Sequence, residues 1–113
     1  MIPSALHAAT TKSLVLAILT KKEESYGYEI IQLVGEISKG AFQWKDGMLY
    51  PVLHRMEKEG LVQSRWGRSE TGRKRKYYRI TDEGHEAFRQ MKAQWEATNS
   101  IMRRAWNLEL RLT

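Results

Sequence analysis

The last third of the sequence carries the pattern that most restricts the fold. Thr81 can cap a helix, Asp82 and Glu83 give that helix an acidic first turn, and no proline follows. A helix over residues 82–107 would be about 40 Å long. Residues 1–80 would form a globule with a diameter of only roughly 30 Å. The end of the helix must therefore extend beyond the domain that precedes it.

One face of this long helix is apolar, with a spacing that alternates between three and four residues. The residues at that spacing are Phe88, Met91, Trp95, Thr98, Met102 and Ala105. The projecting part of a monomer would expose this face to water, which favours a partner helix. We therefore expect a homodimer with an interface formed by Leu14, Ile18, Phe88, Met91, Trp95, Met102 and Trp106. The alternative, a helix that folds back over its own domain, stays open.

Three helices are predicted in the first sixty residues. The first covers about residues 10–20 and is apolar on all sides, so it should be buried. Ser25 can cap a second, amphipathic helix with apolar residues at helical spacing, namely Ile30, Ile31, Val34 and Ile37. Asp46 can cap a third helix that runs to Glu59. Pro51 is tolerated there because it lies near the start of the helix, where few backbone donors have carbonyl partners.

Beyond Gly60 the pattern changes to that of a β-hairpin. Residues 61–66 and 76–80 are rich in strand formers, and the segment between them contains glycine, serine and threonine. The chain is therefore predicted to be mainly α-helical with a two-stranded hairpin, which is the plan of a winged helix-turn-helix. We place this domain at residues 1–80 and a C-terminal dimerisation helix at residues 81–113.

The positive charge of the chain is concentrated in the predicted hairpin. The formal net charge is +6, and residues 65–80 carry seven lysines and arginines against Glu70 alone. The remaining segments have equal numbers of basic and acidic residues. A cluster of one sign attracts polyanions, so double-stranded DNA is the expected partner. The alternative is a basic loop that only aids solubility.

Two groups of residues are candidates for DNA contacts. The third helix should enter the major groove with its N-terminal half, which presents Lys45, Met48, Tyr50, His54 and Arg55. The hairpin should bind flanking phosphates through Arg68, Arg73, Lys74, Arg75 and Lys76. Tyr26 and Tyr28 are interpreted first as packing residues and second as phosphate contacts. Tyr77 and Tyr78 should lie on opposite faces of a strand, one in the core and one outside.

Five short segments carry a resemblance to the PadR family of bacterial transcriptional regulators. They are residues 26–30 (YGYEI), 47–53 (GMLYPVL), 56–62 (MEKEGLV), 77–81 (YYRIT) and 83–84 (EG). Each segment alone is weak evidence, but their order and spacing together are specific over residues 14 to about 90. Met48 departs from the pattern, because family members commonly have serine or threonine there.

The resemblance implies a DNA-binding homodimer that binds a palindromic operator and acts as a repressor. It also implies release from DNA when a small planar aromatic molecule binds. In some relatives a tryptophan of the C-terminal helix and its dimer mate enclose such a ligand, and Trp95 has the matching location. An ordinary role for Trp95 in the dimer interface is the alternative.

Several other classes of protein have little support. The sequence has no cysteine, three scattered histidines, no phosphate-binding glycine loop and no metal-ligand spacing, so we expect no enzyme, cofactor or metal site. The longest apolar run, residues 14–19, is too short to span a membrane, and we expect a cytoplasmic protein. A winged helix that binds RNA or another protein is the remaining alternative.

Overall fold

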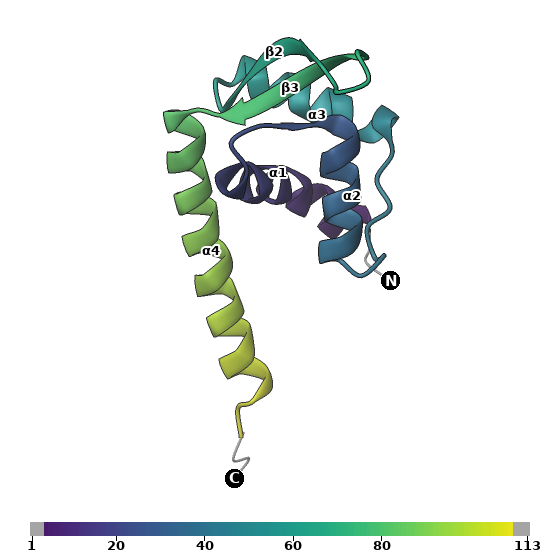
Figure 1. The fold of residues 1–113 in the computed structure, drawn as a ribbon. Helices are drawn as coiled ribbons and strands as arrows, with labels where there is room; N and C mark the ends of the chain where they lie inside the picture. The colour runs from purple at the N-terminus through teal and green to yellow at the C-terminus, as the bar shows by residue number, and fades with distance from the viewer. Residues whose placement is uncertain (1–3, 110–113) are drawn as a thin grey trace.

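The computed structural model describes residues 4–109, with side chains from Thr10 onward, and consists of helices and a small sheet (Figure 1). Residues 1–3 and 110–113, the ends of the two predicted domains, lie outside this range. The elements are α1 (Ser4–Lys21), β1 (Ser25–Tyr26), α2 (Gly27–Ile37), α3 (Asp46–Lys58), β2 (Val62–Arg68), β3 (Lys74–Ile80) and α4 (Asp82–Trp106). This is the predicted winged helix-turn-helix followed by a long helix.

The sheet has three strands instead of the two predicted. Its order is β1-β3-β2 and all pairs are antiparallel, with Ser25 opposite Tyr78. Ser25 is therefore not the cap of α2, which begins at Gly27 without a side-chain cap. The reason is that Ser25 lies in the extended strand and is fully buried, where its hydroxyl donates a 2.6 Å hydrogen bond to Glu29 Oε1.

The hairpin formed by β2 and β3 is longer than expected. Its register runs from Val62 opposite Ile80 to Arg68 opposite Lys74, so the loop shrinks to residues 69–73. Gly72 has a φ of +83°, a value that glycine adopts without strain, and it closes this loop. We call β2, β3 and this loop the wing.

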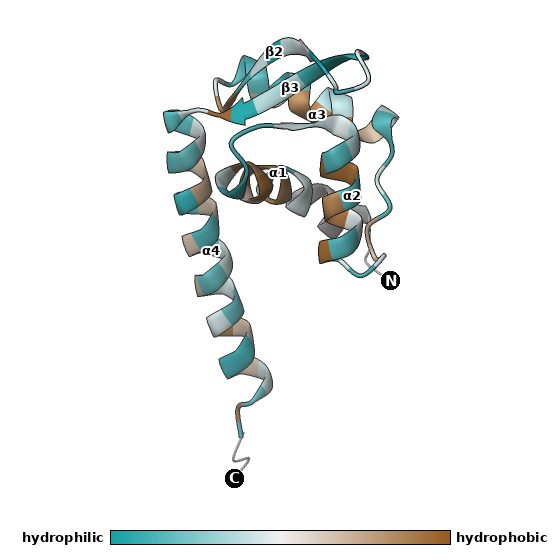
Figure 2. Cartoon of the chain, viewed as in Figure 1, coloured by the Kyte–Doolittle hydropathy of each residue, from teal (hydrophilic) through white to brown (hydrophobic). Residues whose placement is uncertain are grey.

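The core lies where α1, α2 and α3 meet beneath the sheet. Its buried apolar residues are Val15, Leu16, Ile18, Leu19, Ile30, Val34, Phe42, Trp44, Leu49, Leu53, Met56, Leu61, Val62 and Tyr78. Figure 2 shows hydrophobic residues gathered on α1 and α2 and mainly hydrophilic residues along α4. Ile37, predicted on the buried face of α2, is 60% exposed because it is the last residue of the helix.

The start of α3 lies one residue away from its predicted cap. Lys45 is the N-cap, with extended backbone angles, and Asp46 is the first helical residue. The carbonyl of Lys45 accepts the backbone N–H groups of Met48 and Leu49 at 3.0 Å. Pro51 lies inside the helix as predicted, and the helix ends at Lys58.

The beginning of α4 is held tightly against the wing. Thr81 caps the helix as predicted, because its Oγ1 accepts the backbone N–H of Gly84 at 3.0 Å and donates to the carbonyl of Gly60 at 2.6 Å. A Cβ on Gly84 would lie 2.1 Å from the carbonyl oxygen of Leu61. Only glycine therefore allows this approach of α4 to Leu61, the residue before β2.

The two halves of α4 have different surroundings. Phe88 and Met91 pack against the core near α1, and Trp95 is partly buried. The described residues from 96 to 109 are all exposed, and the described part of the molecule measures 71 Å along its longest axis. In Figure 1 this second half projects away from the other elements. The predicted overhang is confirmed, and only the first half folds back onto its own domain.

Candidate nucleic-acid interface

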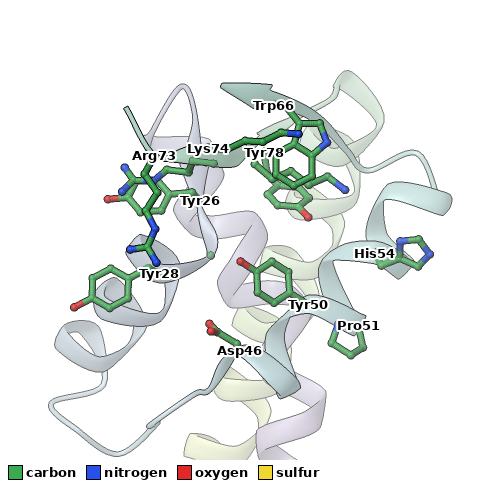
Figure 3. Close-up of a pocket in the computed structure, with 13 residues that line it drawn as sticks. Tyr26, Tyr28, Asp46, Tyr50, Pro51, His54, Trp66, Arg73, Lys74 and Tyr78 are labelled. Atoms are coloured by element: carbon green, nitrogen blue, oxygen red, sulfur yellow. The ribbon is translucent and has the colours of Figure 1, made fainter. Parts of the chain in front are cut away.

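A large open cleft lies between the wing, α3 and the start of α2. Its volume is about 1060 Å³, and Figure 3 shows Tyr28 and Tyr50 on the helix side and Arg73, Lys74 and Trp66 on the wing side. The cleft is lined by Tyr26, Gly27, Tyr28, Asp46, Tyr50, Pro51, His54, Trp66, Arg73, Lys74, Arg75, Lys76 and Tyr78. It therefore brings together side chains from both predicted groups of DNA-contacting residues.

The start of α2 sets the position of Tyr50 in the cleft. A Cβ on Gly27 would lie 2.9 Å from the Tyr50 hydroxyl oxygen, so the glycine makes room for that ring. Tyr28, on the next position of α2, is 62% exposed, and its hydroxyl accepts a 2.8 Å hydrogen bond from Gln32 Nε2. The interpretation of Tyr28 as a packing residue is therefore wrong, because its side chain lies at the rim of the cleft.

The predicted contact residues of α3 do not share one environment. Lys45 and Arg55 are exposed but do not line the cleft. His54 lies at the edge of the cleft and points away from Tyr50 in Figure 3. Met48 is partly buried against the core, so most of its role is packing. Tyr50 is the predicted residue that faces the cleft most directly.

The face of the wing that looks toward α3 carries an aromatic and basic group. Trp66 pairs with Lys76 across the strands, and Arg68 pairs with Lys74. Lys74 Nζ lies 4.8 Å from the centre of the Trp66 ring, and Lys76 Nζ lies 5.8 Å from it. The sequence pattern did not single out Trp66. The sequence signal that could have found Trp66 is its position two residues after Ser64, which puts both residues on the strand face that looks toward α3.

Glu57 joins this face of the wing to α3. Its Oε2 accepts a hydrogen bond from Ser64 Oγ, and its Oε1 lies 3.9 Å from Lys76 Nζ. Burial raises the pKa of Tyr78 to about 12, and the Glu57 charge acts in the same direction. Tyr78 therefore stays neutral beneath the wing. Tyr78 is buried and Tyr77 is more exposed, as predicted from strand alternation.

The opposite face of the wing uses part of the positive charge internally. Arg65 forms two 2.6 Å hydrogen bonds to the Glu24 carboxylate, which lower the pKa of Glu24. Arg65 also lies over the Tyr77 ring, and Arg75 lies 3.8 Å from the centre of the Tyr26 ring. The Tyr26 and Tyr77 rings meet edge to face. Arg75 and Tyr26 thus act as packing residues as well as lining the cleft.

Three predicted wing cations remain available to an anion. In the described part of the chain, Arg68, Arg73 and Lys74 form no ion pair with a carboxylate, and all three are exposed. Arg68 donates a 2.9 Å hydrogen bond to the carbonyl of Gly72. A polyanion in the cleft would therefore meet unpaired positive charge.

A second, smaller groove lies between α1 and α4. Its volume is about 280 Å³, and it is lined by Thr10, Ser13, Leu14, Ala17, Phe88, Met91, Lys92 and Trp95. Trp95 Nε1 donates a 3.4 Å hydrogen bond to Ser13 Oγ. This groove contains the predicted effector residue and several predicted interface residues. We call it the α1–α4 groove.

The predicted interface residues fall into three places. Leu14, Phe88, Met91 and Trp95 line the α1–α4 groove, whereas Met102 and Trp106 lie on the exposed end of α4. Ile18 lies in a third place, because its side chain is 4% exposed and packs in the core of a single chain.

Comparison with known proteins identifies the family. The model of the transcriptional regulator PadR-like family matches residues 15–90, which include α2, α3 and the wing. The chain belongs to this family. It is 34% identical over 90 residues to an uncharacterised protein of Lysinibacillus sphaericus, covering 80% of this chain and 82% of that one. It is also 42% identical over 55 residues to a transcriptional regulator of Mycobacterium tuberculosis, about half of each chain.

Solved structures of PadR-like regulators share the architecture. A transcriptional regulator from Clostridium thermocellum superposes with a TM-score of 0.81 at 32% identity, covering 92% of this chain and 97% of that one. A PadR family regulator from Clostridium difficile gives a TM-score of 0.76 at 34% identity, with coverages of 86% and 98%. These coverages extend beyond the wing, so the likeness includes part of α4.

PadR family membership sets the class of function. The relatives are transcriptional regulators and not enzymes, and the chain is a DNA-binding regulator of this kind. Among residues 10–109, no three histidine, aspartate or glutamate side chains gather where they could hold a metal ion. No helix in that range is both long and apolar enough to cross a bilayer.

Proposed function

We propose that this PadR-family regulator is a repressor that binds a palindromic DNA operator as a homodimer. The observation that carries the proposal is the single cleft lined by both α3 and the wing. A duplex that received α3 in its major groove would bring its phosphates against the wing. The repressor role itself is inferred from the family.

The two walls of the cleft would have different tasks. Tyr50 and His54 on α3 would approach base edges, and Lys45 at the N-cap and Arg55 on the helix would reach the phosphates beside them. Arg68, Arg73 and Lys74 on the wing would bind the backbone of the neighbouring turn. These cations position the protein, whereas α3 selects the sequence.

The projecting half of α4 supports the homodimer. Its exposed apolar residues are Ile101, Met102, Trp106 and Leu108, which a monomer would leave in water. A second copy of α4 would cover them through a symmetric, self-complementary contact. A two-fold dimer carries two recognition helices in opposite orientations, and for this reason its operator would be palindromic.

The α1–α4 groove supports a site for a planar aromatic effector. Its volume is at the lower end of small-molecule sites, so one chain would supply half of a pocket that the second chain completes. Trp95 offers a ring face for stacking, which accepts many flat ligands without fixed hydrogen bonds. Because the same groove adjoins α4, a bound ligand would alter the spacing of the two recognition helices.

Footprinting on the DNA upstream of its own gene tests the proposed function. The protein should protect two half-sites whose centres lie about 34 Å apart, or a multiple of that distance, on one face of the duplex. Tyr50→Ala should lose the protection. Arg89→Ala, an exposed change on α4 away from the cleft, should retain it. Protection of a single half-site, or none, would contradict the proposal.

Tryptophan fluorescence tests the effector site. Planar aromatic compounds should quench the emission of the wild-type protein and release it from DNA, and Trp95→Phe should lose most of the quenching. Trp66→Phe is the matched control for quenching in the absence of DNA, because Trp66 lies on the wing, outside the groove. Equal quenching in wild type and Trp95→Phe would exclude Trp95 as the effector contact.

A further inference from the structure

An unburied tryptophan stands in the middle of the wing. Trp66 is 61% exposed, although it lies on the same strand face as the buried Val62. Its neighbour on that face, Ser64, is tied to α3 through Glu57. Trp66 lies farther along β2 than this Ser64–Glu57 hydrogen bond and lines the cleft. Its large apolar surface therefore has no role in the core of this chain.

The groups around Trp66 are basic. Lys74 and Lys76 hold their ammonium groups 4.8 Å and 5.8 Å from the centre of its ring, distances at which a cation is attracted by the aromatic face. Arg68 follows on the same face of β2. Apolar and positively charged groups therefore alternate on this surface. Deoxyribose and phosphate groups alternate in the same way along a DNA strand.

We propose that Trp66 packs against a deoxyribose of the DNA strand that passes between α3 and the wing, while Arg68 and Lys74 bind the adjoining phosphates. The proposal rests on the proposed DNA-binding function. Trp66 lies within β2 and not in the loop at residues 69–73. A bound duplex would therefore bring its sugar-phosphate backbone against Trp66, and not the base edges at the bottom of a DNA groove. Arg73, in that loop, is the side chain that would reach into the groove.

An apolar contact and an ionic contact have different salt dependences. Each phosphate neutralised by a lysine adds about 0.9 to the slope of log affinity against log salt. Contact between an indole ring and a sugar releases no counterion, so it contributes equally at every salt concentration. The two parts of the proposal can therefore be separated by one set of titrations.

The test measures affinity for operator DNA at several salt concentrations in the wild-type protein and four variants. Trp66→Ala should weaken binding roughly tenfold at every salt concentration with an unchanged slope, as for loss of an aromatic stacking contact. Trp66→Phe should recover most of the affinity. Lys74→Ala should reduce the slope by about 0.9 per subunit. Gln63→Ala, on the opposite face of the same strand, is the control and should bind as wild type.

Three results would overturn the proposal. Wild-type affinity in Trp66→Ala would show that the ring makes no contact. A loss in Trp66→Ala that appears as a reduced slope would show that Trp66 only positions the lysines. Wild-type protein without salt-dependent DNA binding would overturn the proposed function as well. Circular dichroism of each variant checks that the exposed substitution leaves the fold intact.

Discussion

Glu57→Gln should make the protein less stable and its DNA binding more salt-dependent. The Glu57 carboxylate accepts a hydrogen bond from Ser64 and lies 3.9 Å from Lys76 Nζ, so it restrains the wing against α3. Glutamine can still accept from Ser64 but carries no charge. The pair is partly exposed, which limits the loss to about 1 kcal/mol. For a domain of this size that is a fall in Tm of roughly 4 °C.

The same change should free Lys76 for a phosphate. In the wild-type protein the carboxylate competes with DNA for that ammonium group, since both offer anionic oxygens. Its removal should steepen the slope of log affinity against log salt by up to about 0.9 per subunit, or about 1.8 in a dimer. The variant should therefore bind operator DNA more tightly at low salt although it melts earlier.

Thermal melting and salt-dependent DNA titration measure the two effects. Glu59→Gln is the matched control. This substitution makes the same change in net charge, but Glu59 pairs with Lys12 at 3.2 Å, away from the wing. A slope that is unchanged in Glu57→Gln, or steepened equally in both variants, would refute the reasoning. Such a result would mean that Lys76 is already free, or that only net charge matters.

Three further changes test other parts of the account. Gly84→Ala should destabilise the protein by several kcal/mol or prevent folding, because the new Cβ would lie 2.1 Å from the Leu61 carbonyl; a wild-type melting curve would contradict this packing. Between about pH 10 and 12 stability should fall by roughly 2 kcal/mol, because the folded state holds the Tyr78 proton more tightly than the unfolded chain. Tyr78→Phe should remove that part of the pH dependence, and an identical alkaline profile would show that Tyr78 is not responsible. Met102→Asp should weaken the dimer by more than tenfold in sedimentation experiments, and an unaffected dimer would place the interface elsewhere.

The order of helices and strands could be predicted from the sequence because each feature follows from a local rule. The cap at Thr81 and the length of α4 follow from capping chemistry and helix rise, and both agree with the structure. The position of the charge on the hairpin is a property of the sequence itself. The wing and α3 line one cleft, as expected for this arrangement of elements.

The errors occurred where tertiary contacts override local preference. Ser25 has good capping chemistry, but pairing with β3 draws it into a strand. Ile37 fits the helical period of α2 but lies past the edge of the core. Ile18 was expected at the dimer interface and packs in the core of its own chain, and a pattern of apolar residues cannot distinguish the two places.

Residues of the candidate site were harder to assign than elements. A count of basic residues cannot tell that Arg65 pairs with Glu24 and that Arg75 lies over the Tyr26 ring, whereas Arg68 pairs with no carboxylate among the described residues. Trp66 was missed because its exposure depends on how far the hairpin extends beyond α3. These assignments depend on the length and register of the strands, which local pattern leaves uncertain by several residues.

The most direct test of the central claim is the salt dependence of DNA binding in wild type and in Arg68→Ala/Arg73→Ala/Lys74→Ala. The two subunits of the proposed homodimer would present six of these cations, so the account predicts that the triple variant loses about 5 from the slope of log affinity against log salt. A triple variant that keeps the wild-type slope would contradict the claim that the wing holds the DNA backbone.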